Sequence, residues 1–306
     1  GAEMVRALGR ATTKVTYELE KSKPDLILSG FDIAANFAVT IAGAHMNIPV
    51  AHIQGGEVTG TIDESLRHAM SKFSHYHLVA NDDARQRLIR MGEIPEHVFV
   101  VGCPSIDAIL DVMDIPDKEL NAEFGIDVSE PFVIVIQHPV TTEIDHVEEQ
   151  IMETVEAIKA IGVQALLIYP NNDAGSRRII KEIENSSINR FQTLSIEKYV
   201  NLLKRSSALI GNSSGGIHET ATFHVPTVNI GTRQQGRLKP LHVIDVSHNR
   251  NEISKAILKC LDDKEFKANI QEYENPYGDG KSAERIVRIL KEIDISNKII
   301  QKRITY

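Results

Sequence analysis

Residues that could carry chemistry gather in five short polar segments. The most highly charged, AHIQGGEVTGTIDESLRHA at residues 51–69, places glycines, carboxylates, histidines and an arginine directly after an apolar run. The others are QHPVTTE from Gln137, PNNDAGS from Pro170, NSSGGIHE from Asn212 and GTRQQGR from Gly231, each after an apolar or β-branched run. Ligands of open parallel sheets bind beyond the carboxyl ends of the strands, so this placement predicts a site built from strand-to-helix loops.

The segment GNSSGGIHE is typical of an anion site. Small residues at Ser213, Ser214 and Gly215 would let backbone N–H groups approach a phosphate at the positive end of the following helix. Glu219, one turn further, could accept hydrogen bonds from a ribose diol. The alternative is an ordinary helix N-cap in which Glu219 completes the capping arrangement. The spacing fits neither a P-loop nor the three-glycine dinucleotide motif.

Two other loops carry candidate groups. His138 follows an apolar run and precedes a proline, and a neutral imidazole there could act as acid, base or phosphate donor. Arg233 and Arg237 are cations that could bind phosphate oxygens. A structural histidine, solvated arginines and an Asx turn in PNNDAGS are the alternatives. The other histidines show no metal-ligand pattern, so no metal site is predicted.

The elements that must position these loops are strands and helices in alternation. Apolar or β-branched runs predict strands within residues 24–29, 48–53, 75–80, 97–102, 131–137, 164–170, 190–195, 207–213, 225–231 and 241–246. Amphipathic stretches predict helices over 33–46, 62–73, 82–91, 143–161, 176–183, 196–204 and 251–261, with another beginning near Gly215. This alternation predicts parallel sheets with crossover helices, an α/β fold of two Rossmann-like halves.

The predicted domain boundary lies in the acidic segment DVMDIPDKELNAEFGIDVSEP, where the strand rhythm is weakest. We place the first domain at residues 1–115 and the second at 116–288. Residues 289–306 are expected to form a helix that crosses back to the first domain, or a frayed tail. A chain of 306 residues with 42% hydrophobic side chains is long enough to bury two cores.

Composition excludes several classes of function. The net charge of −8 argues against binding to nucleic acid or anionic lipid. Cys103 and Cys260 lie far apart in apolar segments, which favours free thiols in a reducing cytoplasm. No apolar run approaches the ~18 residues of a membrane helix, and the first residues lack a signal peptide's apolar core. We therefore expect a cytoplasmic protein that does not enter membranes.

Several motifs together resemble the hydrolysing UDP-N-acetylglucosamine 2-epimerases, the family of sialic and legionaminic acid synthesis. They are HIQGGEVTGTIDESLRHAMSKFSHYHLVAN, GCPSIDAIL, QHPVTT, YPNNDAGS, IGNSSGGIHE, GTRQQGR and YGDG, running from about Pro24 to Ile286. The resemblance implies a GT-B-type architecture with UDP mainly on the second domain, a UDP-sugar substrate, no NAD or metal, and a homo-oligomer, either dimer or tetramer. In the implied reaction a base removes the proton at C2 while UDP leaves C1. Water then adds, so the products are UDP and free N-acetylmannosamine or its analogue.

The resemblance also assigns roles to individual residues. The diphosphate would bind at Ser213, Ser214 and Gly215, and the ribose at Glu219, with Asn171, Asp173 and Arg233 lining the nucleotide side. His138 would lie close to the leaving phosphates. Asp63 matches an acidic catalytic residue of the family, and Arg67 follows one turn further along the same helix.

The sequence departs from the family pattern in the first domain. Gln54 stands where many relatives carry an acid–base glutamate, which leaves Glu57, Asp63 and His138 as candidates for proton transfer. A Gly-Asp-Arg triplet before Phe31 and the family's first strand have no counterpart, so the first domain looks incomplete at its N-terminus. Either the sequence lacks segments of an active enzyme, or the protein is a variant. Such a variant would be a UDP-sugar-binding or regulatory protein, or an enzyme for another UDP sugar; a GT-B glycosyltransferase is the further alternative.

Overall fold

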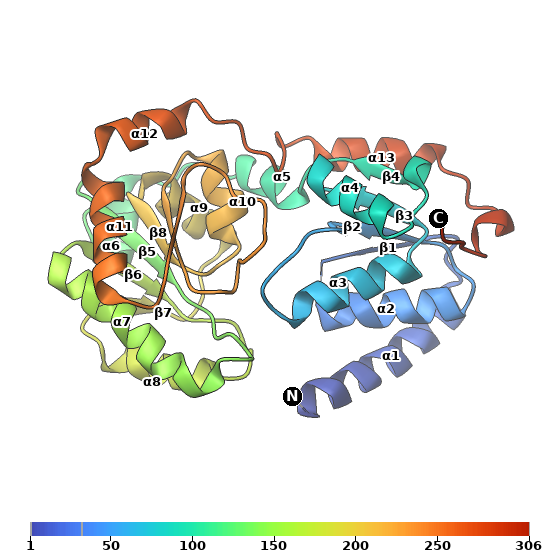
Figure 1. Ribbon diagram of the computed structural model, residues 1–306, viewed down its shortest axis with the longest axis horizontal. Coiled ribbons are helices and arrows are strands. Elements are labelled where there is room, and N and C mark those ends of the chain that lie inside the picture. The colour runs from blue at the N-terminus through green and yellow to red at the C-terminus, as the bar shows by residue number, and fades with distance from the viewer. Residues whose placement is uncertain (1, 32, 306) are drawn as a thin grey trace. The chain divides into compact units, whose positions relative to one another are not determined.

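The computed structural model describes residues 2–31 and 33–305. The chain forms two compact units, one made of residues 1–107 and 276–306 and the other of residues 108–275. Each unit contains one parallel sheet with helices packed on it (Figure 1). The predicted α/β class with two parallel sheets is therefore confirmed.

The first unit has a four-stranded sheet in the order β1-β2-β3-β4. Its strands are β1 (Ile27–Gly30), β2 (Val50–Ile53), β3 (Tyr76–Val79) and β4 (Val98–Val100). Its helices are α1 (Ala2–Ser22), α2 (Ala34–His45), α3 (Ile62–Phe73), α4 (Asp82–Arg90), α13 (Ser282–Glu292), and the short turns η1 (Pro95–His97) and η3 (Asn297–Ile299), while α5 (Pro104–Leu110) runs into the second unit.

Alternating side chains of the first sheet pack against helices on its two faces. On one face, Ala51 and Leu78 join Ile286 of α13 in one hydrophobic cluster. On the other face, Val50 packs with Leu19 of α1 and Ala42 of α2. Because successive side chains of a strand point to opposite faces, strands covered on both sides are mostly apolar; here the buried polar exceptions are Ser29, His52 and His77.

The second unit has a six-stranded sheet in the order β10-β9-β8-β5-β6-β7. Its strands are β5 (Phe132–Ile136), β6 (Gln164–Ile168), β7 (Asn189–Phe191), β8 (Ala208–Gly211), β9 (Thr227–Ile230) and β10 (Val243–Val246). Its helices are α6 (Asp117–Phe124), α7 (Val147–Ile161), α8 (Ser176–Asn185), α9 (Ile196–Arg205), α10 (Gly215–Thr222), α11 (Arg250–Asp262), α12 (Lys264–Gln271) and the turn η2 (Ile144–His146). This is the doubly wound strand order, which reverses between β5 and β8.

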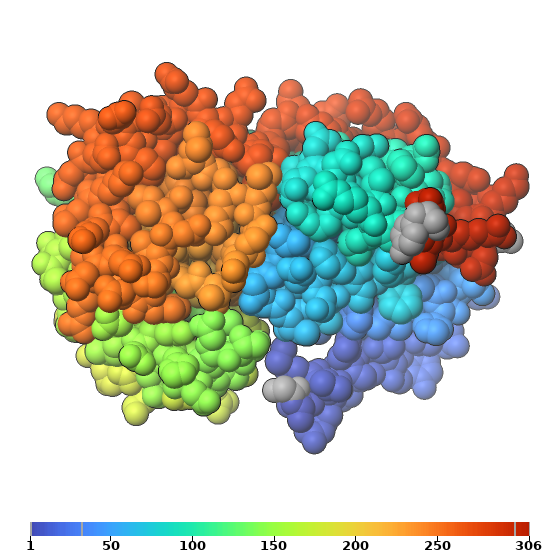
Figure 2. All heavy atoms as spheres, in the orientation of Figure 1, coloured from blue at the N-terminus to red at the C-terminus, as the bar shows by residue number. Residues whose placement is uncertain are grey.

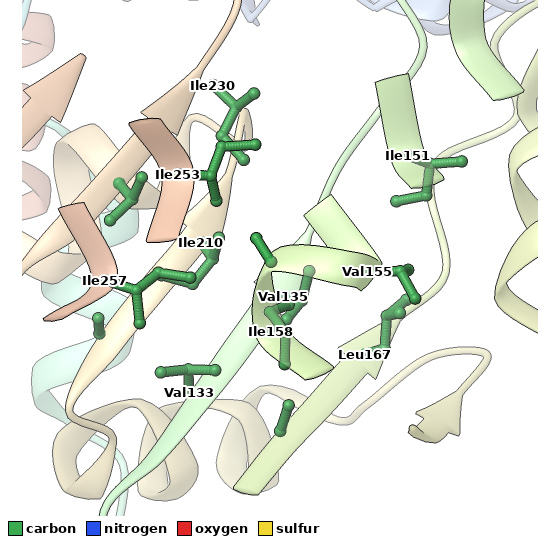
Figure 3. Packing of buried hydrophobic residues seen from close by; sticks show 14 of the residues in the cluster. Val133, Val135, Ile151, Val155, Ile158, Leu167, Ile210, Ile230, Ile253 and Ile257 are labelled. Atoms are coloured by element: carbon green, nitrogen blue, oxygen red, sulfur yellow. The ribbon is translucent and has the colours of Figure 1, made fainter. Parts of the chain in front are cut away.

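Two hydrophobic clusters cover the faces of the second sheet. Val133 and Val135 of β5 pack with Ile158 of α7 and Ile257 of α11 on one face (Figure 3). Ile134 of β5 alternates to the other face and packs with residues of α6 and α9. Because helices cover both faces of the sheet, its exposed loops lie at the ends of the strands. The polar segments of the sequence lie in these loops.

The predicted elements largely match the structure. Each of the ten predicted strands overlaps an observed one, and the predicted helix over 62–73 coincides with α3. Helices α1, α5, α6, α12 and α13 were not predicted; the helix or tail expected over 289–306 overlaps only the end of α13. The segment expected to hold the domain boundary contains α6, a helix that buries Leu120 and Phe124 in the second unit.

The end of the chain returns to the first unit. The units divide after residues 107 and 275, whereas the sequence placed the boundaries after residues 115 and 288. The return is fixed by backbone and side chain: Cys103 N donates to Tyr277 O at 2.7 Å, and the Asp107 carboxylate accepts from Ser282 N and Oγ at the start of α13. Beyond α13 the chain is mostly non-helical. Across residues 2–31 and 33–305, no helix is both long and apolar enough to span a bilayer.

Candidate functional site

The loops after β5 and β8 meet at the point where the strand order of the second sheet reverses. β5 and β8 are neighbours in the sheet, with Ile136 opposite Gly211, so the residues after them begin side by side. At such a switch point the crossover helices leave to opposite faces of the sheet and open a crevice between the two loops. The sequence places His138 in one loop and Asn212 through Gly215 in the other.

Asn212 ties these two loops together. Its side chain is 1% exposed and forms two hydrogen bonds to one residue: Oδ1 accepts from His138 N at 2.7 Å, and Nδ2 donates to His138 O at 2.9 Å. Its own backbone N donates to Ile136 O at 3.0 Å. Asn212 therefore acts as a buried cross-link that sets the spacing of the loops.

The His138 ring is held as a neutral hydrogen-bond donor. Asn171 N donates to its Nδ1 at 3.1 Å, so in the neutral ring Nε2 carries the hydrogen. Burial, together with the charge of Arg233, lowers the pKa of His138 to about 3. A ring with this pKa stays uncharged near neutral pH, and its free nitrogen offers a donor rather than a proton acceptor.

The loop after β9 contributes cationic and amide donors at the same place. Arg233 Nη1 and Gln234 Nε2 donate to the carbonyl oxygen of Asn212, at 3.1 and 2.8 Å. Gln234 Oε1 in turn accepts from Arg237 at 3.1 Å. Three loops of the second sheet are thus joined through the single residue Asn212, and a positive charge lies beside the start of α10.

Gly215 begins α10 in a space that no side chain could share. A Cβ atom on this residue would lie 2.7 Å from Glu219 Oε2 and 2.9 Å from Tyr199 Oη. Glu219 and Tyr199 are hydrogen-bonded to each other, and burial is the main cause that raises the pKa of both. The Glu219 side chain is therefore held beside the first turn of α10. Ser213 Oγ accepts from Gly215 N at 3.3 Å, which also fits the capping alternative.

Asn171 and Asp173 form a local turn after β6. Asn171 Nδ2 donates to Asp173 Oδ2 at 2.6 Å, and Asp173 N donates to Asn171 Oδ1 at 3.3 Å. This is the Asx turn that the sequence left open as the alternative. The same turn presents Asn171 N to His138, so its structural role is to fix the imidazole.

In the first unit, the loop after β2 is held from two helices. Arg87 Nη1 of α4 donates to Gly56 O at 2.6 Å, and Arg67 Nη1 of α3 donates to Glu57 O at 3.0 Å. The Glu57 side chain is 5% exposed and that of Arg67 4%. Gly56 has φ of +80°, a conformation that favours glycine. The loop is thus a rigid, buried turn.

Gln54 has a structural partner inside this unit. Its side chain is 6% exposed, and Nε2 donates to the thiol of Cys103 at 2.8 Å. Its backbone has φ of +58° and continues the ladder by donating from N to Leu78 O at 2.9 Å. An amide can donate to sulfur in this position, which a carboxylate could not do.

Asp63 lies in the first turn of α3. Thr61 caps the helix by accepting from Asp63 N at 3.3 Å, and its hydroxyl donates to Asp63 Oδ2 at 2.9 Å. The carboxylate is partly exposed and sits at the positive end of the helix. Asp63 and Arg67 share one helix, so they move as one body.

The structure groups the predicted residues by unit. His138, Asn171, Arg233 and Gly215 surround Asn212 or its neighbours in the second unit, while Gln54, Glu57 and Arg67 surround the loop after β2 in the first. Sequence reasoning assigned no role to Asn212, Tyr199 or Gln234. Asn212 directly follows a predicted strand, which was the signal available. Among residues 2–31 and 33–305, no group of three or more His, Cys, Asp or Glu side chains could hold a metal ion.

Comparison with known proteins identifies the family. The family model described as UDP-N-acetylglucosamine 2-epimerase matches residues 1–291. A UDP-N,N'-diacetylbacillosamine 2-epimerase (hydrolyzing) of Legionella pneumophila is 36% identical over 305 residues, covering 98% of this chain and 80% of that protein. A UDP-N-acetylglucosamine 2-epimerase of Neisseria meningitidis is 31% identical, covering 99% and 80%. The chain belongs to the UDP-N-acetylglucosamine 2-epimerase family.

Solved structures show the same fold. The structure of a Neisseria meningitidis UDP-GlcNAc 2-epimerase bound to UDP-GlcNAc aligns with a TM-score of 0.82 at 20% identity, covering 95% of this chain and 82% of that one. A Methanocaldococcus jannaschii UDP-GlcNAc 2-epimerase in complex with UDP-GlcNAc and UDP aligns with a TM-score of 0.77 at 22% identity, covering 93% and 80%. The protein therefore has the α/β fold of two parallel sheets found in these GT-B-like structures.

Proposed function

We propose that this protein is a hydrolysing 2-epimerase that converts a UDP-2-acetamido sugar to the free 2-epimer and UDP. The observation that carries the proposal is the cluster around Asn212, at the switch point of the second sheet in a chain of this family. There a neutral Nε2–H donor on His138, the guanidinium of Arg233 and the first turn of α10 adjoin one another. Hydrogen-bond donors and a cation gathered at one place suit a diphosphate leaving group.

The nucleotide would be held mainly by α10 and its neighbours. Backbone N–H groups at Ser214 and Gly215 would meet the diphosphate at the positive end of the helix. Glu219, fixed by Tyr199, would accept hydrogen bonds from the ribose hydroxyls. Asp173 would contribute through the turn that orients His138 rather than through its own contact.

Each remaining residue has a role in the proposed reaction that follows from its contacts. A base takes the proton from C2, the C1–O bond breaks with its electrons on UDP, and a C1–C2 double bond forms. Water then adds across that bond, with a proton returned to C2 on the opposite face. His138 is a donor to the departing UDP in this scheme, because its Nδ1 is already occupied. Proton transfer at C2 falls to Asp63 or Glu57, with Arg67 holding the loop that carries Glu57.

The sugar is either UDP-N-acetylglucosamine or a UDP sugar with a second acetamido group. The Legionella pneumophila relative is named for the diacetylated sugar, and the Neisseria meningitidis relative for UDP-N-acetylglucosamine. Both substrates carry a C2–H and the UDP leaving group that the reaction needs, so the same assay serves for both.

The test is product analysis in deuterium oxide with each UDP sugar. A hydrolysing epimerase releases UDP and a free 2-epimer carrying deuterium at C2. A non-hydrolysing epimerase instead gives a UDP-linked epimer, which would refute the hydrolytic step. Asp63→Asn is expected to lower kcat about 100-fold or more if this carboxylate transfers the proton. Asp82→Asn, at the exposed start of α4, is the matched control and should keep wild-type kcat.

One observation favours a second candidate, a protein that binds a UDP sugar without turnover. Gln54 donates to Cys103 and cannot take a proton from carbon. If the wild type binds UDP but releases neither UDP nor epimer from either sugar, and Gln54→Glu gains turnover, the binding function replaces the enzymatic one. Transfer of the sugar only when an acceptor is added would instead indicate a glycosyltransferase.

A further inference from the structure

The segment that follows α13 is bound to the first unit along its length. Tyr76 Oη donates to Asp294 O at 2.6 Å, and His75 Nε2 donates to Ile300 O at 3.3 Å. Thr305 N donates to Gly92 O at 3.3 Å. Figure 2 shows these red C-terminal residues lying against the teal part of the same unit. The segment is an ordered part of the unit.

The Lys302 side chain contacts four oxygen atoms of the first unit. Its ammonium lies 2.8 Å from Ser71 O, 3.2 Å from Lys72 O and 2.6 Å from Ser74 O, and 2.5 Å from Glu93 Oε2. An ammonium has three hydrogens, so these four oxygens use its whole donor capacity. The side chain is 20% exposed, which leaves little room for water to replace these contacts.

The three carbonyls belong to the C-terminal end of α3. Ser71 and Lys72 lie in its last turn, and Ser74 is its C-cap residue. The last carbonyls of a helix lack partners within the helix and carry its partial negative charge, so a cation there both satisfies and stabilises them. Lys302 therefore caps α3 from a segment about 230 residues away in the chain.

The other side of the ammonium meets a buried carboxylate. Glu93 is 1% exposed and also contacts Lys72 Nζ at 2.8 Å and His77 Nε2 at 2.9 Å. His77 and Lys302 are among the partners that hold the pKa of Glu93 at about 2, against a burial effect in the opposite direction. The Glu93 carboxylate on one side and the three helix carbonyls on the other hold the Lys302 ammonium at the end of α3.

The capped helix is the one that carries Asp63 and Arg67. Ser71 Oγ donates to Arg67 O at 3.1 Å and meets His52 Nδ1 of β2 at 3.2 Å. Helix α3 has 12 residues, so it is a rod of about 18 Å. A displacement at its C-terminal end is transmitted along this rod to its first turn.

We infer that Lys302 is a positioning residue that sets the axial and rotational position of α3, and thereby places Asp63 and the Arg67-held loop for the reaction. This role rests on the proposed function. Lys302 itself touches no substrate, and it acts through the helix that it caps.

The experiment compares Lys302→Met with Lys298→Met in the full chain. Lys298 lies in the same segment but is exposed, so its substitution controls for the loss of a lysine there. With UDP-N-acetylglucosamine or UDP-N,N'-diacetylbacillosamine as substrate, K302M is expected to lower kcat about 10- to 100-fold. KM should stay within about twofold, because the nucleotide is held by the second unit. K302R should recover most of kcat, since a guanidinium also donates to carbonyls and carboxylate.

A second readout is independent of turnover. Amide hydrogen exchange in residues 63–67 should be faster in K302M than in the wild type and unchanged in K298M. Wild-type kcat and exchange in folded K302M, or equal effects of K298M, would overturn the inference. If K302M does not fold, K302Q, which keeps an amide donor without charge, is measured in its place.

The two proposals fail in different ways. A wild type that releases no UDP from either sugar removes the proposed function. Amide hydrogen exchange in residues 63–67, compared between K302M and the wild type, then decides whether Lys302 fixes α3.

Discussion

Replacing Asn212 tests whether one buried amide organises the second unit's site. Asn212→Ala removes two hydrogen bonds, of 2.7 and 2.9 Å, and leaves the backbone N–H and C=O of His138 without that partner. A buried polar group left unsatisfied costs about 1–3 kcal/mol, so the loss of unfolding free energy should be about 2–4 kcal/mol. Because the side chain is 1% exposed, water cannot enter to replace it without rearranging the loops.

Asn212→Asp keeps the shape of the side chain and changes only its hydrogen bonding and charge. The aspartate keeps the acceptor for His138 N but brings a second oxygen to the position 2.9 Å from His138 O, where an N–H now donates. It also adds a negative charge beside the proposed diphosphate. We therefore expect UDP affinity to fall more in N212D than in N212A, by about 10-fold or more.

The assays are urea unfolding and calorimetric titration with UDP. The chain has no tryptophan, so unfolding is followed by far-ultraviolet circular dichroism. Asn172→Ala, an exposed residue at the same edge of the sheet, is the control and should change stability by less than about 0.5 kcal/mol. If N212A unfolds and binds UDP like N172A, Asn212 does not hold these loops and the reasoning is wrong.

Three further predictions concern protonation and space at the same site. Nitrogen NMR of His138 should show a neutral ring with hydrogen on Nε2 at pH 6. A protonated ring at this pH would contradict the proposal that neutral His138 donates a hydrogen bond. With a folded pKa of about 3 against 6.5, His138 lowers stability as pH falls from 6.5 towards 3 and has no effect above that window, so H138Q should flatten this part of the stability profile. Gly215→Ala should weaken UDP binding by displacing Glu219, whereas Gly9→Ala, with nothing within 4 Å, should not; equal affinities would show that the Gly215 space is not needed.

The central strands were predictable because both of their faces are buried, whereas the edge strands β7 and β10 are partly exposed. Runs such as FVIVI in β5 must be apolar at every position, and that signal survives in a single sequence. Helix α1 gave no such signal, since only Leu19 is buried among its 21 residues. Its place is decided by packing against α2, which a local pattern cannot reveal.

The loops that form the site could be predicted, because each follows the end of a predicted strand. His138 and Gly215 follow strands directly, so sheet topology alone brings their loops together. The partners that give these residues their properties come from elsewhere in the chain. Tyr199 precedes Glu219 by a strand and a loop, and Asn171 reaches His138 from the loop after β6. Sequence spacing carries no information on such tertiary hydrogen bonds, and likewise none on Lys302 and α3.

The discontinuity of the first unit has a consequence for how the protein is made. Residues 108–275 emerge from the ribosome as one uninterrupted stretch and include every strand of their sheet. The sheet that begins the chain must wait for α13 and Lys302, which are translated after that stretch is complete. Of the two units, the one whose strands are translated earlier therefore completes its packing later.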